Sequence, residues 1–355
     1  MDTSKIANRI LKGQVVREAI LYETIGDSRV RCGLCERRCV IASGARGFCK
    51  TRMNLEGRLF TLVYGNLSAI ESRPIEIKPF YHYWPGSTAL TFSTWSCNFN
   101  CPWCQNYHLS RRIPDPEIDH YNSPDDIVNL AMLRGDQGLC ASFQEPTLLI
   151  DWALDVFRKG KACGLYSCYV TNGYLTPEAL KILKEAGLTG VKIDVKGDRE
   201  VYENFCGNVD VKKVWRNVCL ARKLGMHVEI VNLLVTGVND DESSIRLLTE
   251  EHIKNAGPET PLHFTRYFPA YQYRRPPTDL SIMYKAYKIA REAGIEYVYL
   301  GNISDEKYEN TVCPQCGAIL IKRSYHGIKK EELSRDYRCM KCGKKIPIIG
   351  RVIER

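Results

Sequence analysis

The chain has 355 residues, of which 44% are hydrophobic, so it can bury a core in one large domain with one or two small ones. Its net charge is +9, and no apolar run is long enough to cross a bilayer. The first residues, MDTSKIANRILKGQ, lack the apolar core and cleavage site of a signal peptide. These features argue against a disordered chain and a membrane protein, and we expect a cytoplasmic location.

Much of the positive charge lies near the carboxyl terminus, where residues 318–355 hold eleven Lys or Arg against four Asp or Glu. The favoured interpretation is a solvated face that partly offsets the charge of metal-bound thiolates. Contact with nucleic acid or with an acidic partner is the alternative interpretation.

Sixteen cysteines are many for a chain without a signal peptide, and eleven of them form three clusters. In this setting clustered cysteines indicate metal or iron–sulfur ligation, not disulfides. The clusters suggest three modules: a Cys-rich module at 1–85, a core at 86–302 and a zinc-ribbon-like module at 303–355. The other five cysteines are expected to be small buried hydrophobic residues: Cys140, Cys163, Cys168, Cys206 and Cys219.

The first module carries a CxxCxxxCx₉C pattern formed by Cys32, Cys35, Cys39 and Cys49. Four thiolates can bind structural zinc or an auxiliary iron–sulfur cluster that feeds electrons to another cluster. The pattern leaves both alternatives open. Under either one, thiolate charge would be offset by the nearby Arg31, Arg37, Arg38 and Arg46.

The middle module alternates apolar runs with amphipathic helix patterns. Expected strands lie at 89–92, 139–143, 166–170, 190–195, 227–235 and 262–268, with a weaker one at 297–300. Ser123 and Thr176 each precede a proline and predict helix starts, and Thr147 is a candidate cap for the helix after Pro146. This alternation predicts an α/β fold with a parallel sheet, as a partial or full β/α barrel.

Polar side chains follow the expected strands, at the end where such folds place their active sites. The first strand leads into CNFNCPWC, and the second leads into Glu145. Asn172 follows the third strand, and Asp194 and Lys196 mark the end of the fourth. His263 and Arg266 belong to the sixth strand. We expect these groups to converge at one end of the barrel, where the strands finish.

Cys97, Cys101 and Cys104 have the spacing CxxxCxxC. Three soft thiolates on a loop after a strand suit a cuboidal [4Fe–4S] cluster and leave one iron open to a substrate. Zinc is the alternative, with His108 as a fourth ligand, but structural zinc sites favour two pairs of ligands.

The third module carries two CxxC pairs, Cys313 with Cys316 and Cys339 with Cys342, with 22 residues between the pairs. Each second cysteine precedes a glycine, as in a zinc ribbon. We expect a closed structural zinc site; a rubredoxin-like iron site is the alternative.

Nearly the whole chain resembles the radical SAM superfamily. Within it, the chain is similar to activating enzymes of glycyl radical enzymes, such as pyruvate formate-lyase activating enzyme, and to the radical SAM enzymes of the AmmeMemoRadiSam group. The resemblance rests on CGLCERRCVIASGARGFCKTRMNLEG, TWSCNFNCPWCQNYHLS, FQEPT, VTNGY, KIDVKG, PLHFTRYFPAY and NTVCPQCGAIL.

The resemblance implies a role for each site residue in binding S-adenosylmethionine (SAM). Glu145 would contact the amino group, Asp194 the ribose and Lys196 the methionine carboxylate. The alternatives from the residues themselves are a helix cap for Glu145, an ion pair for Asp194 with Lys196, and an ordinary packed residue for His263. The resemblance also places three residues near the cofactor: Trp103, Asn172 and His263.

The resemblance further implies an oxidoreductase whose cluster reductively cleaves SAM to a 5′-deoxyadenosyl radical, which takes hydrogen from a substrate. An electron donor such as flavodoxin or ferredoxin would supply the electron. The leading substrate hypothesis is a protein, as for the activating enzymes. Radical modification of a small molecule or of RNA is the alternative.

Overall fold

The computed structural model describes residues 11–118, 120–324 and 327–354, and it divides into two compact units. The first takes the described residues up to Arg73 together with Ala89–Asn100 and Cys104–Thr189. The second takes Pro74–Thr88, Cys101–Trp103 and the described residues from Gly190 onward. The three-module division at residues 85 and 302 stays a prediction.

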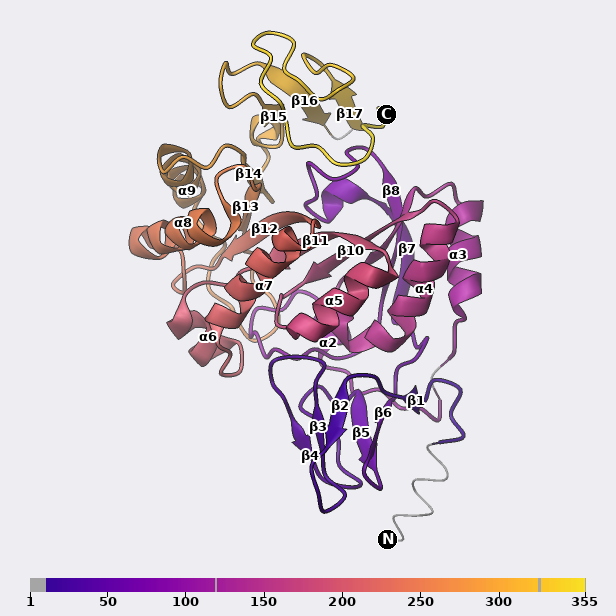
Figure 1. Cartoon of the computed structure of the whole chain (residues 1–355). Coiled ribbons are helices and arrows are strands. Elements are labelled where there is room, and N and C mark those ends of the chain that lie inside the picture. The colour runs from indigo at the N-terminus through magenta and orange to yellow at the C-terminus, as the bar shows by residue number, and fades with distance from the viewer. Residues whose placement is uncertain (1–10, 119, 325–326, 355) are drawn as a thin grey trace. The chain divides into compact units, whose positions relative to one another are not determined.

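An eight-stranded sheet has the strand order β14-β13-β12-β11-β10-β9-β8-β7 (Figure 1). Its pairs β8–β9, β9–β10, β11–β12, β12–β13 and β13–β14 are parallel. The linear order makes the sheet a partial barrel, not a closed one. The strands are β7 (Ala69–Pro74), β8 (Thr88–Ser93), β9 (Gly138–Ala141), β10 (Tyr166–Thr171), β11 (Leu188–Asp194), β12 (His227–Leu234), β13 (Leu262–Arg266) and β14 (Val298–Gly301).

The seven expected strands are all confirmed, with small shifts at their ends, and β7 is an additional strand. The strands are mostly buried, which explains why they read as near-continuous apolar runs. The fold class predicted from the alternation, an α/β fold with a mostly parallel sheet, is therefore confirmed.

Helices alternate with these strands along the chain. They are α2 (Tyr107–Ser110), α3 (Pro124–Leu133), α4 (Ile150–Ala162), α5 (Pro177–Ala186), α6 (Arg199–Phe205), α7 (Val211–Lys223), α8 (Glu242–Ala256) and α9 (Leu280–Glu292), with 3₁₀ turns η1 (Ile75–Ile77), η2 (Pro146–Leu149) and η3 (Glu306–Tyr308). Within the described ranges, no helix is long and apolar enough to cross a bilayer.

Two of the three predicted helix caps are confirmed. Ser123 forms a capping box with Asp126 before α3, and Thr176 accepts from the amide of Ala179 before α5. The prediction for Thr147 is wrong, because Glu145 caps η2 and accepts from the Thr147 amide. A carboxylate is the stronger acceptor at this turn, and Thr147 instead contributes a donor.

The N-terminal part of the first unit contains two small antiparallel sheets. One has the order β1-β6-β5, from β1 (Arg17–Glu18), β5 (Arg52–Leu55) and β6 (Arg58–Thr61). The other has the order β2-β3-β4, from β2 (Tyr22–Thr24), β3 (Val30–Cys32) and β4 (Val40–Ile41). A separate apolar cluster fills this part, from Val15, Val16, Met53, Leu55, Phe60 and Leu62.

The C-terminal sheet has the order β15-β16-β17, from β15 (Thr311–Val312), β16 (Ile319–Ser324) and β17 (Gly327–Lys330). Its apolar residues pack with Tyr297 and Tyr299 of the β14 region in one core cluster. The Trp84 amide donates to the Ile349 carbonyl, and the Ile349 amide donates to the His82 carbonyl, both at 2.8 Å. The C-terminal sheet is therefore part of the second unit.

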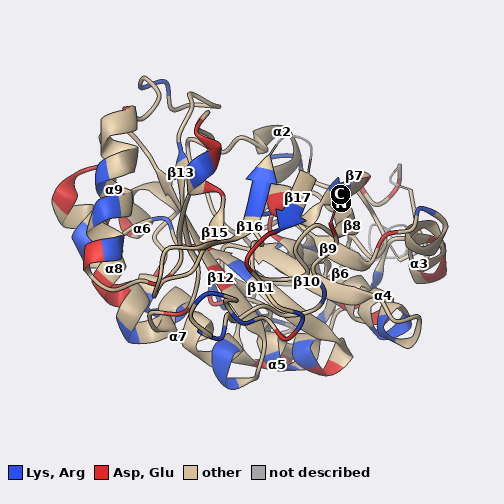
Figure 2. Cartoon of the chain, turned by 90° about the horizontal axis from the view of Figure 1, so that it is seen from above, with Lys and Arg blue, Asp and Glu red and all other residues tan. Residues whose placement is uncertain are grey.

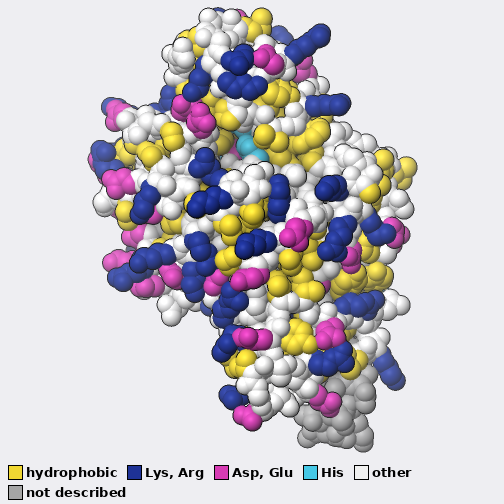
Figure 3. Space-filling view, in the orientation of Figure 1, with side chains coloured by type: hydrophobic (Ala, Val, Ile, Leu, Met, Phe, Trp, Pro, Cys, Tyr) yellow, Lys and Arg dark blue, Asp and Glu magenta, His cyan; other side chains and the backbone are white. Residues whose placement is uncertain are grey.

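Basic residues are spread over the surface and are mixed with acidic ones. Figure 2 shows Lys and Arg on β16 and β17, and both charge signs on α8 and α9. In the C-terminal segment, Arg338 pairs with Asp336, and Lys344 lies 3.0 Å from Glu296. The face in Figure 3 shows dark blue side chains interspersed with magenta. These pairs support the interpretation of the excess charge as a solvated face.

Candidate active site and metal centres

The three cysteines of CxxxCxxC follow β8 at its carboxyl end. Cys97 and Cys104 are half-buried and Cys101 is buried. Within the first unit, Cys97 Sγ accepts a hydrogen bond from the Phe99 amide at 3.4 Å, and Cys104 Sγ lies 3.3 Å from Ser110 Oγ. Thiolates near polar donors at the exit of a strand are suited to metal ligation.

Glu145 is fully buried at the exit of β9, where donors surround its carboxylate. Oε1 accepts from the Thr147 amide at 3.1 Å and from the hydroxyls of Thr147 and Thr171 at 2.5 and 2.7 Å. Oε2 accepts from the Asn172 amide at 2.8 Å. Burial raises the pKa of Glu145, while these hydrogen bonds lower it in part. Because a carboxylate oxygen can accept more than one hydrogen bond, Oε2 keeps room for a ligand donor.

Asn172 follows β10 and joins Glu145 to the cluster loop. Its Nδ2 donates to Asn98 Oδ1 at 2.7 Å and lies 3.9 Å from Cys97 Sγ. The next residue, Gly173, has φ 72°, a left-handed backbone that glycine adopts without strain. The first unit therefore brings together three predicted site residues: Cys97, Glu145 and Asn172.

Asp194 ends β11 in the second unit, where it lies between two lysines. Its carboxylate is 2.6 Å from Lys192 Nζ and 3.4 Å from Lys196 Nζ. Burial raises the pKa of Asp194, but the two lysines outweigh burial and the net pKa is lowered. Burial lowers the pKa of Lys196, but the charges of Asp194 and Cys101 raise it above its usual value. Both groups are thus charged at neutral pH, and the predicted ion pair is present.

Trp103 and Cys101 also belong to the second unit. The Trp103 ring is buried and packs against Phe205 at 5.4 Å and Tyr273 at 5.8 Å between centroids. Cys101 Sγ lies 3.8 Å from Cys206 Sγ. Cys206 is buried, as predicted. Its proximity to Cys101 was not predicted. Of the other four isolated cysteines, Cys163 is exposed and Cys219 half-buried, so those two predictions are wrong.

Several buried polar atoms near the carboxyl ends of the strands have no hydrogen-bond partner within the described ranges. In the first unit they are Asn98 Nδ2 and both polar atoms of the Gln144 side chain; in the second they are Asn232 Oδ1 and Thr236 Oγ1. An unpaired buried group costs about 1–3 kcal/mol, so in each unit taken by itself these atoms are suited to bind a polar ligand. Three soft thiolates fit an iron–sulfur cluster with one open iron. The residues present therefore fit both groups.

His263 lies at the register level of Asp194, because both residues pair with Val231 of β12. It is the second residue of β13, near the amino end of that strand, and is buried. Its Nε2 is 2.7 Å from Glu229 Oε2, and Glu229 also accepts from the amides of Tyr81 and His82. The packed-residue alternative fits this hydrogen bonding, and the place of His263 near the cofactor stays a prediction. Glu229 could have indicated this buried pair from the sequence, because a carboxylate inside an apolar strand needs a buried partner.

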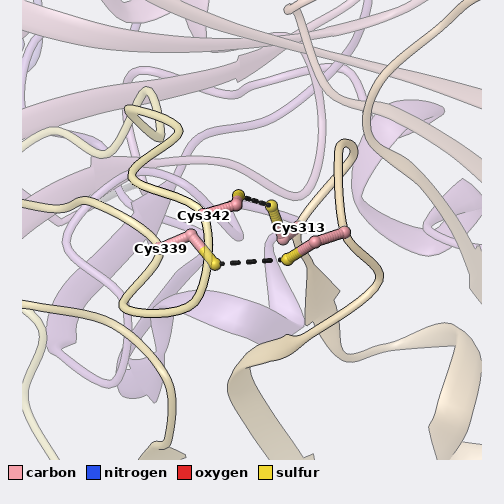
Figure 4. A group of neighbouring side chains, drawn as sticks. Cys313, Cys339 and Cys342 are labelled. Atoms are coloured by element: carbon pink, nitrogen blue, oxygen red, sulfur yellow. Dashed lines mark hydrogen bonds between the residues drawn. The ribbon is translucent and has the colours of Figure 1, made fainter.

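The C-terminal cysteines converge on one point. The sulfurs of Cys313, Cys316, Cys339 and Cys342 all lie within 4.8 Å of one another. Figure 4 shows three of them labelled, with contacts of 3.5 Å joining Cys313 to Cys342 and Cys316 to Cys339. Burial raises the pKa of Cys339, but the amides of Cys342 and Lys341 outweigh it and lower that pKa to about 7. The four thiols can hold one tetrahedral metal ion.

The cysteines of the N-terminal pattern are free thiols, of which Cys32, Cys35 and Cys49 are buried and Cys39 is half-buried. Burial raises the pKa of Cys32 to about 11, with smaller effects from Arg52, Cys49 and Cys39. The arginines expected to offset thiolate charge have other partners: for example, Arg31 pairs with Glu23, and Arg37 donates to the Asn98 carbonyl. The buried cation here is Arg52, which the sequence analysis missed.

Comparison with known proteins indicates the class to which the chain belongs. Residues 93–248 match the model of the "Radical SAM superfamily". The "Uncharacterized protein MJ0808" of Methanocaldococcus jannaschii is 36% identical over 336 residues, which cover 94% of this chain and 100% of that protein. A "GTP 3',8-cyclase" of Pelotomaculum thermopropionicum is 27% identical over 151 residues. That match covers 41% of this chain, and the chain spans about half the length of the cyclase, 46%.

Among solved structures, a domain of pyruvate-formate lyase-activating enzyme from Bacteroides vulgatus superimposes with a TM-score of 0.40 at 20% identity. It covers 46% of this chain and 99% of that domain.

The parallel sheet, the CxxxCxxC loop at the end of β8 and the family match define one class of protein. The chain belongs to the radical SAM superfamily. This membership implies a [4Fe–4S] cluster and SAM as cofactors.

Proposed function

We propose that this protein is a radical SAM enzyme in which Cys97, Cys101 and Cys104 hold the catalytic [4Fe–4S] cluster. One observation carries the proposal: Asn172 contacts both Cys97 and Glu145. Its side-chain Nδ2 lies beside Cys97 Sγ, and its backbone amide donates to the buried Glu145 carboxylate. When bound, the cluster supplies the electron that cleaves SAM, so that the 5′-deoxyadenosyl fragment can take a hydrogen atom from the substrate.

The chain's own residues bind and orient SAM in this proposal. Glu145 accepts from the amino group of the methionine part, because its Oε2 has a single protein donor. Lys196 neutralises the methionine carboxylate, and Asp194 accepts from the ribose hydroxyls. Trp103 packs near the adenine, and Asn172 forms the floor beside Cys97. Holding both reactants in place is where a protein contributes most to such a reaction.

The Lys196→Met variant tests this assignment. The variant removes the charge that neutralises the SAM carboxylate, so we expect KM for SAM to rise about 10-fold or more while the cluster still loads. Lys184→Met, at a half-buried position of α5, is the matched control. An unchanged KM for SAM in Lys196→Met would remove Lys196 from the site.

We propose a protein as the substrate, on the strength of the motifs shared with activating enzymes of glycyl radical enzymes. The similarity to GTP 3',8-cyclases favours a nucleotide as the second candidate. Isotope transfer separates the two. Deuterium should move into 5′-deoxyadenosine from a uniformly deuterated protein extract; transfer from deuterated GTP would support the second candidate instead.

Two accessory assignments complete the proposal. A one-electron donor of the flavodoxin or ferredoxin class reduces the cluster. The four C-terminal cysteines hold structural zinc, since their sulfurs lie close enough for one tetrahedral ion and zinc prefers a closed four-thiolate site.

A further inference from the structure

The N-terminal quartet, Cys32, Cys35, Cys39 and Cys49, differs in geometry from the C-terminal quartet. All sixteen cysteines lie in the described ranges, and the C-terminal sulfurs are all within 4.8 Å of one another. No three sulfurs of the N-terminal quartet, which is also fully described, meet that spacing. Tetrahedral zinc at about 2.3 Å from each sulfur needs sulfurs about 4 Å apart. A cuboidal cluster puts several iron atoms between its thiolates and suits a wider quartet.

The quartet is nevertheless one local group. The Cys32 amide donates to the Cys39 carbonyl at 2.9 Å. Strand β3, which ends at Cys32, pairs with β4, which begins directly after Cys39. The amide of Gly47, two residues before Cys49, donates to the Arg52 carbonyl at 2.9 Å. Four neighbouring thiols, mostly buried and without a disulfide, are the donor set of a polynuclear iron site.

Arg52 points to a ligand inside this group. It is 1% exposed, with Nη2 2.5 Å from Asp151 Oδ2 and Nη1 donating to the Ile20 carbonyl at 3.3 Å. Its Nε has no hydrogen-bond partner within the described ranges. Arg52 adjoins the quartet along the chain, because it follows Thr51, whose Oγ1 lies 3.1 Å from Cys49 Sγ. A buried N–H without an acceptor, next to thiols, suits the sulfur of a bound cluster.

The quartet also contacts both chain neighbours of Cys97. Ser96 Oγ donates to the Cys49 carbonyl at 2.6 Å. Asn98, which is fully buried, accepts from Asn172 Nδ2 at 2.7 Å through its side chain, and its carbonyl accepts from Nε of Arg37, two residues after Cys35. Cys35 itself forms a bridge with Leu175, and the Glu36 amide donates to the Tyr174 carbonyl at 3.0 Å. The segment that carries the quartet therefore contacts the residues on either side of Cys97.

We propose that Cys32, Cys35, Cys39 and Cys49 bind an auxiliary [4Fe–4S] cluster that relays electrons to the catalytic cluster. One electron enters from a reduced flavodoxin- or ferredoxin-class donor and takes the auxiliary cluster from the 2+ to the 1+ state. The same electron then passes to the catalytic cluster, and the auxiliary cluster returns to 2+. The relay rests on the proposed function, whereas the metal content of the quartet does not.

The metal test uses a full-length variant without the catalytic ligands, Cys97→Ala/Cys101→Ala/Cys104→Ala. After anaerobic reconstitution with ferrous iron and sulfide, we expect about four iron and four sulfide per chain, with a paramagnetic signal on reduction by dithionite. Adding Cys35→Ser and Cys49→Ser to this variant should remove iron, sulfide and signal together. Adding Cys163→Ser at the exposed cysteine instead is the matched control and should leave them unchanged.

Two outcomes would overturn the proposal. The first is a catalytic-ligand variant that holds two zinc per chain and no iron. The second is iron that survives Cys35→Ser/Cys49→Ser. Because this variant cannot cleave SAM, neither outcome depends on the proposed function. If the quartet holds iron but wild-type protein makes no 5′-deoxyadenosine, the cluster assignment stands and the relay falls.

Arg52→Lys tests the contact with the cluster. Lysine keeps the charge opposite Asp151 but lacks the Nε–H group. We expect the quartet still to hold iron, with a midpoint potential of the auxiliary cluster lower than in wild type, because a donor to cluster sulfur is lost. An unchanged midpoint potential would show that Arg52 Nε does not contact the cluster.

Discussion

At the scale of single residues, the site depends on buried polar groups that hold one another in place. Glu145 receives donors from η2, β10 and the turn that follows β10, so one carboxylate ties three segments together. Asp194 forms ion pairs with Lys192 of β11 and with Lys196, which follows that strand. Such groups are costly to bury without partners.

Replacing Glu145 by Gln should weaken SAM binding by about 10-fold or more. The amide loses the negative charge and sets an NH₂ group against backbone and hydroxyl donors, at a cost of about 1–3 kcal/mol. Calorimetric titration of the reconstituted protein with SAM measures the effect. Glu185→Gln, at an exposed position of α5, should bind SAM like wild type. Wild-type affinity in Glu145→Gln would refute the role of Glu145.

The buried His252 makes stability depend on pH. Burial lowers its pKa to about 4, and its Nε2 pairs with the Thr260 carbonyl at 3.0 Å. The unfolded chain takes up the proton first, so stability is full above about pH 6.5 and falls as the pH drops toward 4. At pH 5 the loss from this residue is about 2 kcal/mol. Urea unfolding of wild type and His252→Gln at pH 7.5 and 5 should show a smaller loss in the variant. An equal loss of unfolding free energy in both proteins would show that His252 is not the source of the pH dependence.

At the scale of elements, apolar patterns predict the strands well because a parallel sheet buries both faces of its strands. The caps of α3 and α5 follow from Ser–Pro and Thr–Pro pairs. The pairing of Arg52 with Asp151 joins residues 99 positions apart in the sequence, and no local pattern indicates such a pair. The contact of His263 with Glu229 joins residues 34 positions apart, which no local pattern indicates either.

The C-terminal sheet should depend on its metal. Cys339→Ser removes one of four ligands, and metal binding supplies folding free energy on the order of 10 kcal/mol in such modules. We expect β15–β17 to lose protection from hydrogen exchange, while α3 and α4 keep theirs. Hydrogen-exchange mass spectrometry with zinc analysis checks this. Full protection of β16 in a zinc-free variant would show that packing against Tyr297 and Tyr299 is sufficient.

At the scale of the whole molecule, the chain carries three groups of cysteines, one before β8, one directly after β8 and one after β14. The sequence alone predicts the fold class, the catalytic cysteines and the C-terminal quartet, because each rests on spacing or periodicity. It leaves the N-terminal quartet open, since a CxxCxxxCx₉C pattern does not report how far apart its sulfurs lie. The spacing of the sulfurs and the buried Arg52 support the auxiliary cluster that we propose.

The most direct test of the central claim is the formation of 5′-deoxyadenosine. Wild type and Cys97→Ala are purified without oxygen, reconstituted, reduced with dithionite and mixed with SAM. We predict that wild type produces 5′-deoxyadenosine and that Cys97→Ala does not. Wild-type protein that carries a reduced catalytic cluster and leaves SAM intact, or a Cys97→Ala variant that cleaves SAM as fast as wild type, would contradict the account.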